Sequence, residues 1–542
     1  MKNLKNVIAM KKLSIIFLLC VTCIQLFAVV PVIPLPQKYS EQRGSFKFNE
    51  ETALMLTAGS AELQSVFDWW KDFMEENYGI NLKSVEGKRT ANIIQCTLEP
   101  TIKDDAGYQL KVSRSVIRIV AKKPIGVFYA FQTLRQLLPA QCTEGNQSIS
   151  IPCVKIEDHP AFSYRGLMLD VSRHFISKEE LKRYIDLMAF HKLNVLHWHL
   201  TDDQGWRLEI KKYPKLTKVG SVRPKTIIGH MWNKPTDWDT EAYGGYYTQE
   251  DIREIVSYAQ KRYVEIIPEI EMPGHCVAAL AAYPEYSCSG GPFEVEGRWG
   301  VFNDIYCTKE STFQFLQDVL DEVVDLFPSK YIHLGGDESP RVRWENCVNC
   351  QRRMKEEGLK TEAELQTYFM NRIESYLSTK GKCIIGWDEI LEGGIPQRAT
   401  VMSWRGEKGG IQAARKGYHV IMSPNSCMYL NKHQLNPKTE KIGIRQCLYL
   451  KHVYSYHPVP SVLNAKEASY ILGVQANLWT EYLVNRTQID YCLFPRLGAV
   501  AEIGWTEQSK KDYDDFCARL KHVKMHYNRL NVEYCRDIYE PK

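Results

Sequence analysis

The spacing of hydrophobic and polar positions changes along the chain. Before residue 160, helical spacing from Glu62 to Tyr78 is followed by alternating positions from Tyr108 to Val120 and by helical spacing again from Gly126 to Leu138. This order predicts a small α+β unit. His159-Pro160 marks the linker that ends it, because the residue before a proline disfavours helical backbone.

From Tyr164 onwards, short apolar runs alternate with helical stretches, which is typical of repeated β-α units around a parallel sheet. Capping boxes at Ser177-x-x-Glu180 and Thr361-x-x-Glu364 open two of the helices. Eight such units over about 350 residues predict an α/β fold, a (β/α)₈ TIM barrel with long loops. The eight expected strands are Gly166–Val171, Leu193–Leu200, Val264–Glu271, Tyr331–Leu334, Cys383–Trp387, Thr400–Trp404, His419–Met422 and Ile471–Leu478.

The first thirty residues differ from the rest of the chain. Several lysines precede the apolar run Leu13 to Val30, and prolines follow it, which predicts a signal peptide and export to the periplasm, the cell surface or the medium. The run is long enough that an uncleaved anchor is the alternative, whereas Cys20 and Cys23 fit a lipoprotein cleavage site poorly. No second segment could span a bilayer, so no stable membrane partner is expected. The expected division is 1–30 signal peptide, 31–160 α+β domain, 161–510 barrel, and 511–542 C-terminal helix and tail.

Composition narrows the function only slightly. The 542 residues are 44% hydrophobic and 25% charged, which is ordinary for a globular protein. A net charge of +5 on so long a chain gives no reason to expect nucleic acid as a partner. Aromatic residues reach 11%, and flat sugar faces favour such side chains, but large cores also use them. The oligomeric state stays open.

The cysteines allow more than one interpretation. Cys347 and Cys350 form a lone Cys-x-x-Cys, and a zinc site would need two more ligands, for which no matching pair lies nearby in the sequence. A local disulfide or two structural thiols are therefore expected there. Cys288 and Cys307 flank a glycine-rich loop that a disulfide could close, since export permits disulfides. No metal and no cofactor are expected.

The strand ends carry the candidate chemistry, because barrel active sites lie at the C-terminal ends of the strands. Acids and tryptophans gather at those ends, and Asp337 and Glu338 are adjacent after Gly335-Gly336. Two carboxylates this close disfavour joint ionisation, so one pKa should rise. A protonated carboxylic acid near neutral pH is what a leaving glycosidic oxygen requires. The alternative is a pair of solvated loop acids, and neighbouring acids are common.

The segment His333-Leu334-Gly335-Gly336-Asp337-Glu338 resembles the His-x-Gly-Gly-Asp-Glu signature of family 20 glycoside hydrolases, the β-N-acetylhexosaminidases. The resemblance extends from about Tyr108 to Trp505 and is weaker before that. Other segments similar to the family's motifs follow in its order: Tyr164-Arg165-Gly166, His197 to Arg207, Pro268 to His275, Gly386-Trp387, Ser403-Trp404, Tyr429, and Gln475 to Glu481.

The resemblance implies a hydrolysis with retained configuration. Glu338 would be the general acid and then the general base, while Asp337 would hold the substrate's 2-acetamido group and stabilise positive charge on its nitrogen. The acetamido oxygen, rather than a protein carboxylate, would attack the anomeric carbon and form an oxazolinium intermediate that water opens. A tethered nucleophile has a high effective concentration, and a neighbouring carboxylate stabilises the cation it becomes.

The resemblance also implies how the sugar is held. Arg165 would bind ring hydroxyls with its planar guanidinium, and Tyr429 would donate to the acetamido oxygen. At Asn431 many family members have Asp, and since Asn can donate as well as accept, the choice between gluco and galacto substrates stays open. The remaining implied roles are Trp387, Trp404 and Trp479 around the acetamido pocket and sugar face, Glu481 at the opposite edge of the sugar, and Asp202 with His275 as a pair that tunes Glu338.

Three functions are weighed. The first is an exo-acting β-N-acetylhexosaminidase that takes N-acetylhexosaminide glycans. The second is a glycosidase of the same family that releases a disaccharide, which needs a deeper pocket. The third is an inactive carbohydrate-binding protein. The intact pair of Asp337 and Glu338, together with Arg165, Tyr429 and the three tryptophans, argues against it.

Overall fold

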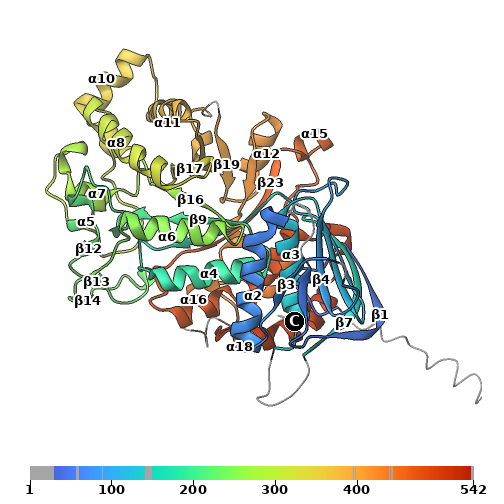
Figure 1. Cartoon of the computed structure of the whole chain (residues 1–542). Helices are drawn as coiled ribbons and strands as arrows, with labels where there is room; N and C mark the ends of the chain where they lie inside the picture. The colour runs from blue at the N-terminus through green and yellow to red at the C-terminus, as the bar shows by residue number, and fades with distance from the viewer. Residues whose placement is uncertain are drawn as a thin grey trace, which may run out of the picture.

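A computed structural model of the chain describes residues 30–538 except 56–59, 88, 141–148, 395, 397, 437, 439 and 441–442. The expected signal peptide therefore lies almost wholly outside the described residues. Within them, no helix is long and apolar enough to cross a bilayer. Two lobes pack against each other, and the last long helix lies beside the first lobe (Figure 1).

The first lobe is a seven-stranded sheet with two helices packed on it, α2 (Gln64–Tyr78) and α3 (Pro124–Leu137). Pro124 begins α3, a position where proline is favoured because the backbone N–H it lacks would have no partner within the helix. Trp70 of α2 stacks on Phe131 of α3 with 4.6 Å between ring centroids. In sheet order the strands are β1 (Lys38–Lys47), β7 (Ser150–Asp158), β5 (Tyr108–Val112), β6 (Val116–Ala121), β4 (Ile93–Leu98), β2 (Ala53–Met55) and β3 (Lys83–Val85).

The second lobe is a closed barrel of eight parallel strands, which confirms the predicted fold. The apolar runs chosen from the sequence contain the strands, except that β8 begins at Tyr164, before the expected Gly166. Around the ring the strands are β8 (Tyr164–Asp170), β9 (Val195–His199), β16 (Glu265–Glu269), β17 (Tyr331–His333), β18 (Cys383–Trp387), β19 (Thr400–Ser403), β20 (Val420–Met422) and β23 (Ile471–Leu478).

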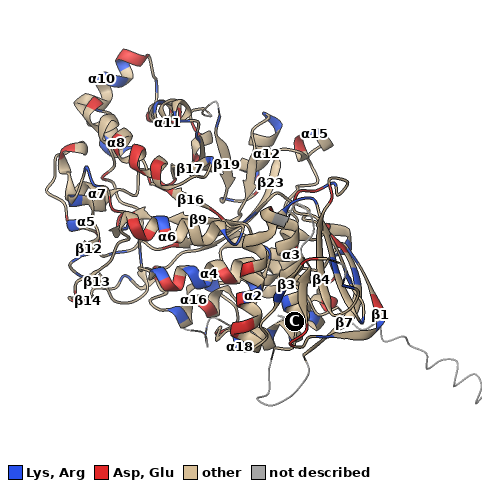
Figure 2. Cartoon of the chain, in the orientation of Figure 1, with Lys and Arg blue, Asp and Glu red and all other residues tan. Residues whose placement is uncertain are grey.

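Helices surround the barrel, and charges of both signs lie on their outer faces (Figure 2). The predicted capping box at Ser177 and Glu180 is present, but at Thr361 only half of one forms, because the Glu364 carboxylate accepts from the Lys360 amide instead. The main outer helices are α4 (Lys178–Phe190), α6 (Gln249–Gln260), α8 (Glu310–Leu326), α11 (Glu362–Thr379), α12 (Lys408–Arg415), α16 (Arg486–Leu493) and α17 (Arg496–Trp505).

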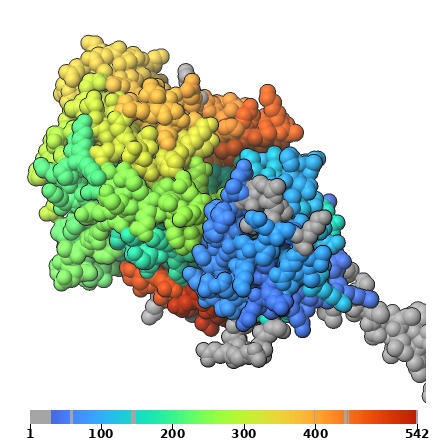
Figure 3. Space-filling view, in the orientation of Figure 1, coloured from blue at the N-terminus to red at the C-terminus, as the bar shows by residue number. Residues whose placement is uncertain are grey.

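The first lobe covers the barrel end at which the strands begin. Lys192, in the turn before β9, forms a fully buried ion pair of 2.8 Å with Asp158 at the end of β7. The indole of Trp505 in α17 donates to the same carboxylate over 2.8 Å. Figure 3 shows the two lobes pressed together along a broad contact. The last helix, α18 (Tyr513–Arg529), contacts both lobes, since Arg519 pairs with buried Glu502 of α17 at 2.7 Å and His526 lies 3.2 Å from the backbone oxygen of Gln136 in α3.

No disulfide joins two cysteines of the described residues. The disulfide that could have closed the Cys288–Cys307 loop is therefore absent, whereas two structural thiols, one of the two alternatives for Cys347 and Cys350, agree with the structure. Cys288 Sγ lies 3.7 Å from Cys350 Sγ, Cys307 Sγ lies 3.7 Å from both Cys347 and Cys350, and all four sulfurs are within 4.8 Å of one another. The reason is that α10 (Val348–Glu357) begins against the loop that Cys288 and Cys307 flank, so all four thiols meet.

Candidate active site

The turn after β17 presents Asp337 and Glu338 at the open rim of the barrel. Gly335 and Gly336 have φ of +67° and +88°, a backbone conformation that side chains disfavour. A Cβ on Gly335 would also lie 1.7 Å from Oε2 of Glu271, so the position has no room for a side chain. Glu338 itself has φ of +40°, and its carboxylate is 42% exposed while that of Asp337 is 10% exposed. The turn thus gives two neighbouring acids different surroundings.

His275 lies below both acids. Its Nε2 is 3.6 Å from Glu338 Oε2 and 3.7 Å from Asp337 Oδ2. Its Nδ1 is 3.2 Å from Asp202 Oδ1 and 3.0 Å from Asp203 Oδ2. The structure therefore brings Asp202, His275 and Glu338 together in the order that the resemblance implied.

These contacts set the protonation of the free site. Burial disfavours a charge on His275, but Asp202, Asp203 and Glu338 outweigh burial and raise its pKa well above the ordinary value. The hydrogen bond from His275 in turn lowers the pKa of Glu338. Burial raises the pKa of Asp337 to about 6. One pKa of the pair does rise, as expected from the sequence, but it belongs to Asp337 rather than to the expected general acid.

A buried polar network supports the rim from inside the barrel. Glu269, at the end of β16, receives the Trp387 indole N–H over 2.9 Å and lies 3.0 Å from His197 and 2.7 Å from His333. His199 links this carboxylate to Asp202, which lies 2.9 Å away. Burial opposes a charge on His199, yet its two carboxylate partners outweigh burial and raise its pKa to about 10. The network fixes Asp202 and, through it, His275.

Aromatic rings form a wall beside the two acids. Trp387 and Trp479 lie 6.1 Å apart between ring centroids, Tyr429 lies 6.2 Å from Trp479, and Trp404 stacks on Tyr429 at 6.0 Å. The indole N–H of Trp404 donates to the Glu389 carboxylate over 2.8 Å, and this hydrogen bond fixes the orientation of the ring. The structure therefore gathers all four predicted aromatic residues at the rim.

Arg165 is not in this site, which corrects the sequence interpretation. It stands near the start of β8, at the covered end of the barrel, while the acids stand at the strand ends. Its guanidinium donates to the backbone oxygens of Lys192 and Phe162 and to the Tyr129 hydroxyl. The arginine at the rim is Arg173, which follows the same strand. It contacts Asp202 at 2.6 Å and lies 4.9 Å from the ring centre of Trp479.

Glu481 and Asn431 flank the aromatic wall. Burial raises the pKa of Glu481 to about 7. Glu481 also lines a cavity of about 560 Å³ together with His174, Trp299 and Tyr482. Asn431 is buried, and its side-chain amide has no hydrogen-bond partner within the described part of the chain.

Sequence reasoning gave no role to two further acids. Glu271 is buried and neither carboxylate oxygen has a hydrogen-bond partner among the described residues. Burial and the nearby Asp337 raise its pKa well above the ordinary value. Burial likewise raises the pKa of Glu389 to about 8, with Asp337 contributing. Their places at strand ends were visible in the sequence, but their burial was not.

Some of these groups could in principle hold a cation. His199 with Glu269 and Glu271, and His275 with Asp202 and Asp203, bring three ligand atoms close together. The histidine nitrogens nevertheless already pair with carboxylates. A proton shared in each pair therefore accounts for the arrangement.

Comparison with known proteins places this geometry in context. The family model described as "Glycosyl hydrolase family 20, catalytic domain" matches residues 162–508, and that of the family's domain 2 matches residues 29–159. The β-hexosaminidase of Porphyromonas gingivalis is 45% identical over 93% of this chain, which spans 64% of that protein's length. The β-hexosaminidase of Vibrio furnissii is 35% identical over 88% of this chain and 77% of its own length.

Solved structures resemble the whole described chain. An exo β-N-acetylglucosaminidase from Vibrio harveyi, in complex with N-acetylglucosamine, superposes with a TM-score of 0.84 at 33% identity and covers 95% of this chain and 79% of its own. A β-hexosaminidase mutant from Streptomyces plicatus, in complex with the product GlcNAc, gives a TM-score of 0.81 at 31% identity, covering 94% of this chain and 97% of its own.

Proposed function

The chain belongs to glycosyl hydrolase family 20, and on that basis we propose that it is an exo-acting, retaining β-N-acetylhexosaminidase that releases terminal non-reducing GlcNAc or GalNAc. The observation that carries the proposal is the turn at Asp337 and Glu338. It presents one buried and one open carboxylate above the same histidine. Disaccharide release and mere binding are not favoured, since the relatives named above are hexosaminidases.

The geometry separates the tasks of the two acids. In the usual retaining scheme a second carboxylate about 5–5.5 Å from the acid attacks the sugar from the opposite face. Asp337 instead adjoins Glu338 in the chain and is buried beside the aromatic wall. It is therefore suited to hold the acetamido N–H, while the acetamido oxygen makes the bond to the anomeric carbon. Glu338, open to solvent, protonates the leaving oxygen and later takes a proton from the attacking water.

Substrate binding itself prepares the proton for transfer. In the free site the higher pKa belongs to Asp337 and the lower to Glu338. A bound sugar covers Glu338 and excludes water, which raises the pKa of a carboxyl group. The acetamido N–H donates to ionised Asp337, which lowers its pKa. The proton therefore moves from Asp337 to Glu338 when the sugar binds.

The surrounding residues hold the sugar. Trp387, Trp404 and Trp479 enclose the acetamido group and one sugar face, and Tyr429 donates to the acetamido oxygen and aligns its attack. Arg173, together with Glu481, takes the hydroxyl-binding place that the sequence interpretation gave to Arg165. Asn431, with its buried amide lacking a partner in the described chain, contributes to the choice between epimers.

Chromogenic N-acetyl-β-glucosaminide and N-acetyl-β-galactosaminide test the activity directly. We expect turnover with retained configuration, inhibition by a thiazoline analogue of the oxazolinium, and a loss of about 10²–10⁴ in kcat for Glu338→Gln. Glu76→Gln, on the surface of α2, is the matched control and should leave kcat unchanged. Absence of turnover from mildly acidic to mildly basic pH would refute the activity. An unchanged rate for Asp337→Ala would refute substrate assistance.

Export is part of the proposal, and the leader-like first thirty residues support it. Mass spectrometry of the N-terminus after expression in a bacterial host separates the alternatives. A mature chain that begins near Pro31 in the exported fraction supports a cleaved signal peptide. An intact N-terminus in the membrane fraction supports the anchor instead.

A further inference from the structure

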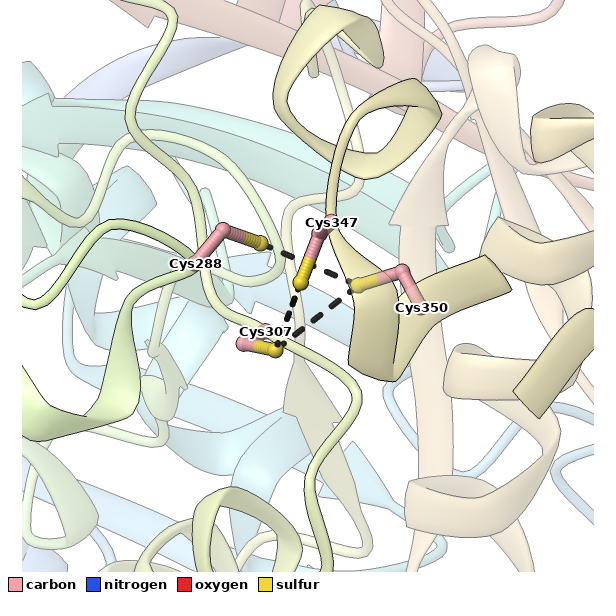
Figure 4. Close-up of side chains that lie close together, drawn as sticks. All are labelled: Cys288, Cys307, Cys347 and Cys350. Atoms are coloured by element: carbon pink, nitrogen blue, oxygen red, sulfur yellow. Dashed lines mark hydrogen bonds between the residues drawn. The ribbon is translucent and has the colours of Figure 1, made fainter. Parts of the chain in front are cut away.

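Four cysteine sulfurs converge in the loops beside the active site (Figure 4). Cys288 follows the short helix at Pro284–Tyr286, Cys307 precedes α8, and Cys347 and Cys350 stand at the start of α10. The contacts Cys288–Cys350, Cys307–Cys347 and Cys307–Cys350 each measure 3.7 Å between sulfurs. All four sulfurs lie within 4.8 Å of one another.

We propose that these four cysteines bind a structural Zn²⁺ ion. A zinc–thiolate bond of about 2.3 Å in a tetrahedral site places neighbouring sulfurs about 3.8 Å apart. The three contacts of 3.7 Å match the edges of such a tetrahedron. Sequence reasoning set zinc aside because no second pair lies near the Cys-x-x-Cys. The fold supplies the missing ligands from Cys288 and Cys307, which are distant in the chain.

The contacts favour an ion over disulfides. Cys307 is equally far from Cys347 and from Cys350, and Cys350 is equally far from Cys288 and from Cys307. The pairs Cys288–Cys350 and Cys307–Cys347 could in principle bond, but their sulfurs lie 3.7 Å apart, far beyond the roughly 2.05 Å of a disulfide, and the equal Cys307–Cys350 contact would be left unexplained. A central cation uses all four sulfurs alike. Thiolates around an ion also explain why four sulfurs meet at one point, which apolar packing alone does not require.

The surroundings suit bound thiolates. Cys307, Cys347 and Cys350 are buried, so solvent has little access to the sulfurs. Cys347 directly precedes α10 and Cys350 lies in its first turn, where backbone N–H groups and the helix dipole stabilise negative charge. A site of four sulfurs selects zinc or iron, and zinc fits a closed site in a hydrolase that needs no electron transfer.

The ion would join two loops of the active-site face. The loop between Cys288 and Cys307 carries Trp299, which lines the cavity beside Glu481. The other two ligands stand on the segment that follows Glu338. Because four protein ligands close the coordination shell, the ion leaves no position for substrate. Its role is to hold the Trp299 loop against the segment after the catalytic pair.

Metal analysis of the purified full-length chain tests the proposal. We expect about one zinc per chain by elemental mass spectrometry, as a single closed site requires. Replacement by Co²⁺ should produce the absorption bands of tetrahedral thiolate coordination. Cys347→Ser should lose the ion and lower the melting temperature, whereas Cys383→Ser, at a free cysteine in the barrel wall, should retain it. Loss of the ion should raise KM more than it lowers kcat, because Trp299 moves and the catalytic pair does not.

Three results would overturn the assignment. The first is a metal-free native protein in which peptide mapping under non-reducing conditions finds disulfides among the four cysteines. The second is four titratable thiols in a native chain that retains no added Zn²⁺. The third is stoichiometric iron in place of zinc. If Cys347→Ser fails to fold, the metal content and Co²⁺ spectrum of the unchanged protein still decide.

Discussion

Replacing His275 with alanine should move the pH profile of kcat/KM to higher pH. The imidazolium lies 3.6 Å from Glu338 and 3.7 Å from Asp337, and its charge lowers the pKa of both carboxyl groups. Without it both pKa values rise. The active free enzyme carries one proton on the pair, so the acidic limb of kcat/KM reports the lower pKa, that of Glu338, and the basic limb reports the higher pKa, that of Asp337. Both limbs should therefore shift to higher pH.

The size of the shift follows from the distances. Unit charges 3.6 Å apart attract by roughly 4–5 kcal/mol at an effective dielectric constant of about 20. Glu338 is 42% exposed, so water screens much of this attraction. We retain about a third, roughly 1.5 kcal/mol, which corresponds to about one pKa unit. In the unchanged enzyme the basic limb should lie near pH 6, the pKa of Asp337.

Initial rates on a chromogenic N-acetyl-β-glucosaminide, measured across the stable pH range, give both limbs. His159→Ala is the control, since this exposed imidazole lies in the linker and should leave the profile in place. A His275→Ala enzyme that is slower at every pH, but whose limbs have not moved, would show that His275 only fills space. The electrostatic reasoning would then be wrong.

Three further substitutions test other parts of the structure. Gly335→Ala should lower the free energy of unfolding by more than the roughly 1–3 kcal/mol of backbone strain, because the new Cβ would meet the buried Glu271 carboxylate. Gly358→Ala is the control: its φ is nearly the same, but no atom lies within 4 Å of the new Cβ, so it should cost only the strain. Urea denaturation compares the two variants. Lys192→Met should destabilise by about 3–5 kcal/mol by leaving its carboxylate partner buried and unpaired, whereas Lys38→Met at an exposed pair should change the melting temperature little. Tyr429→Phe should lower kcat about 10- to 100-fold with little change in KM, because one oriented hydrogen-bond donor is lost. A rise in KM as large as the fall in kcat would contradict its role in aligning the attack.

The barrel was predictable because its signal is local. Each strand is buried on both faces, so it appears as a short, mostly apolar run, and Cys383–Trp387 shows this clearly. The acids Asp337 and Glu338 were predictable for a related reason. They follow directly after such a run, and the fold places every strand end at one rim.

The two failures have different origins. The expected strand Gly166–Val171 already placed Arg165 before its start and Arg173 after its end, so the sugar-binding role given to Arg165 came from the resemblance and not from the strand pattern. The neighbours of Cys350 are instead set by how α10 packs against a loop formed much earlier in the chain. Hydrophobic spacing carries no information about such contacts between distant segments.

The covered end of the barrel decides where the enzyme can be tethered. Arg519 of α18 donates to the backbone oxygen of Val32 over 2.8 Å, and His526 of the same helix lies 3.2 Å from the Gln136 oxygen in α3. The first described residues and the last helix thus meet on the side away from Glu338. A bead or a fused protein attached there would leave the mouth of the barrel facing the bulk solution, where large, slowly diffusing glycans arrive.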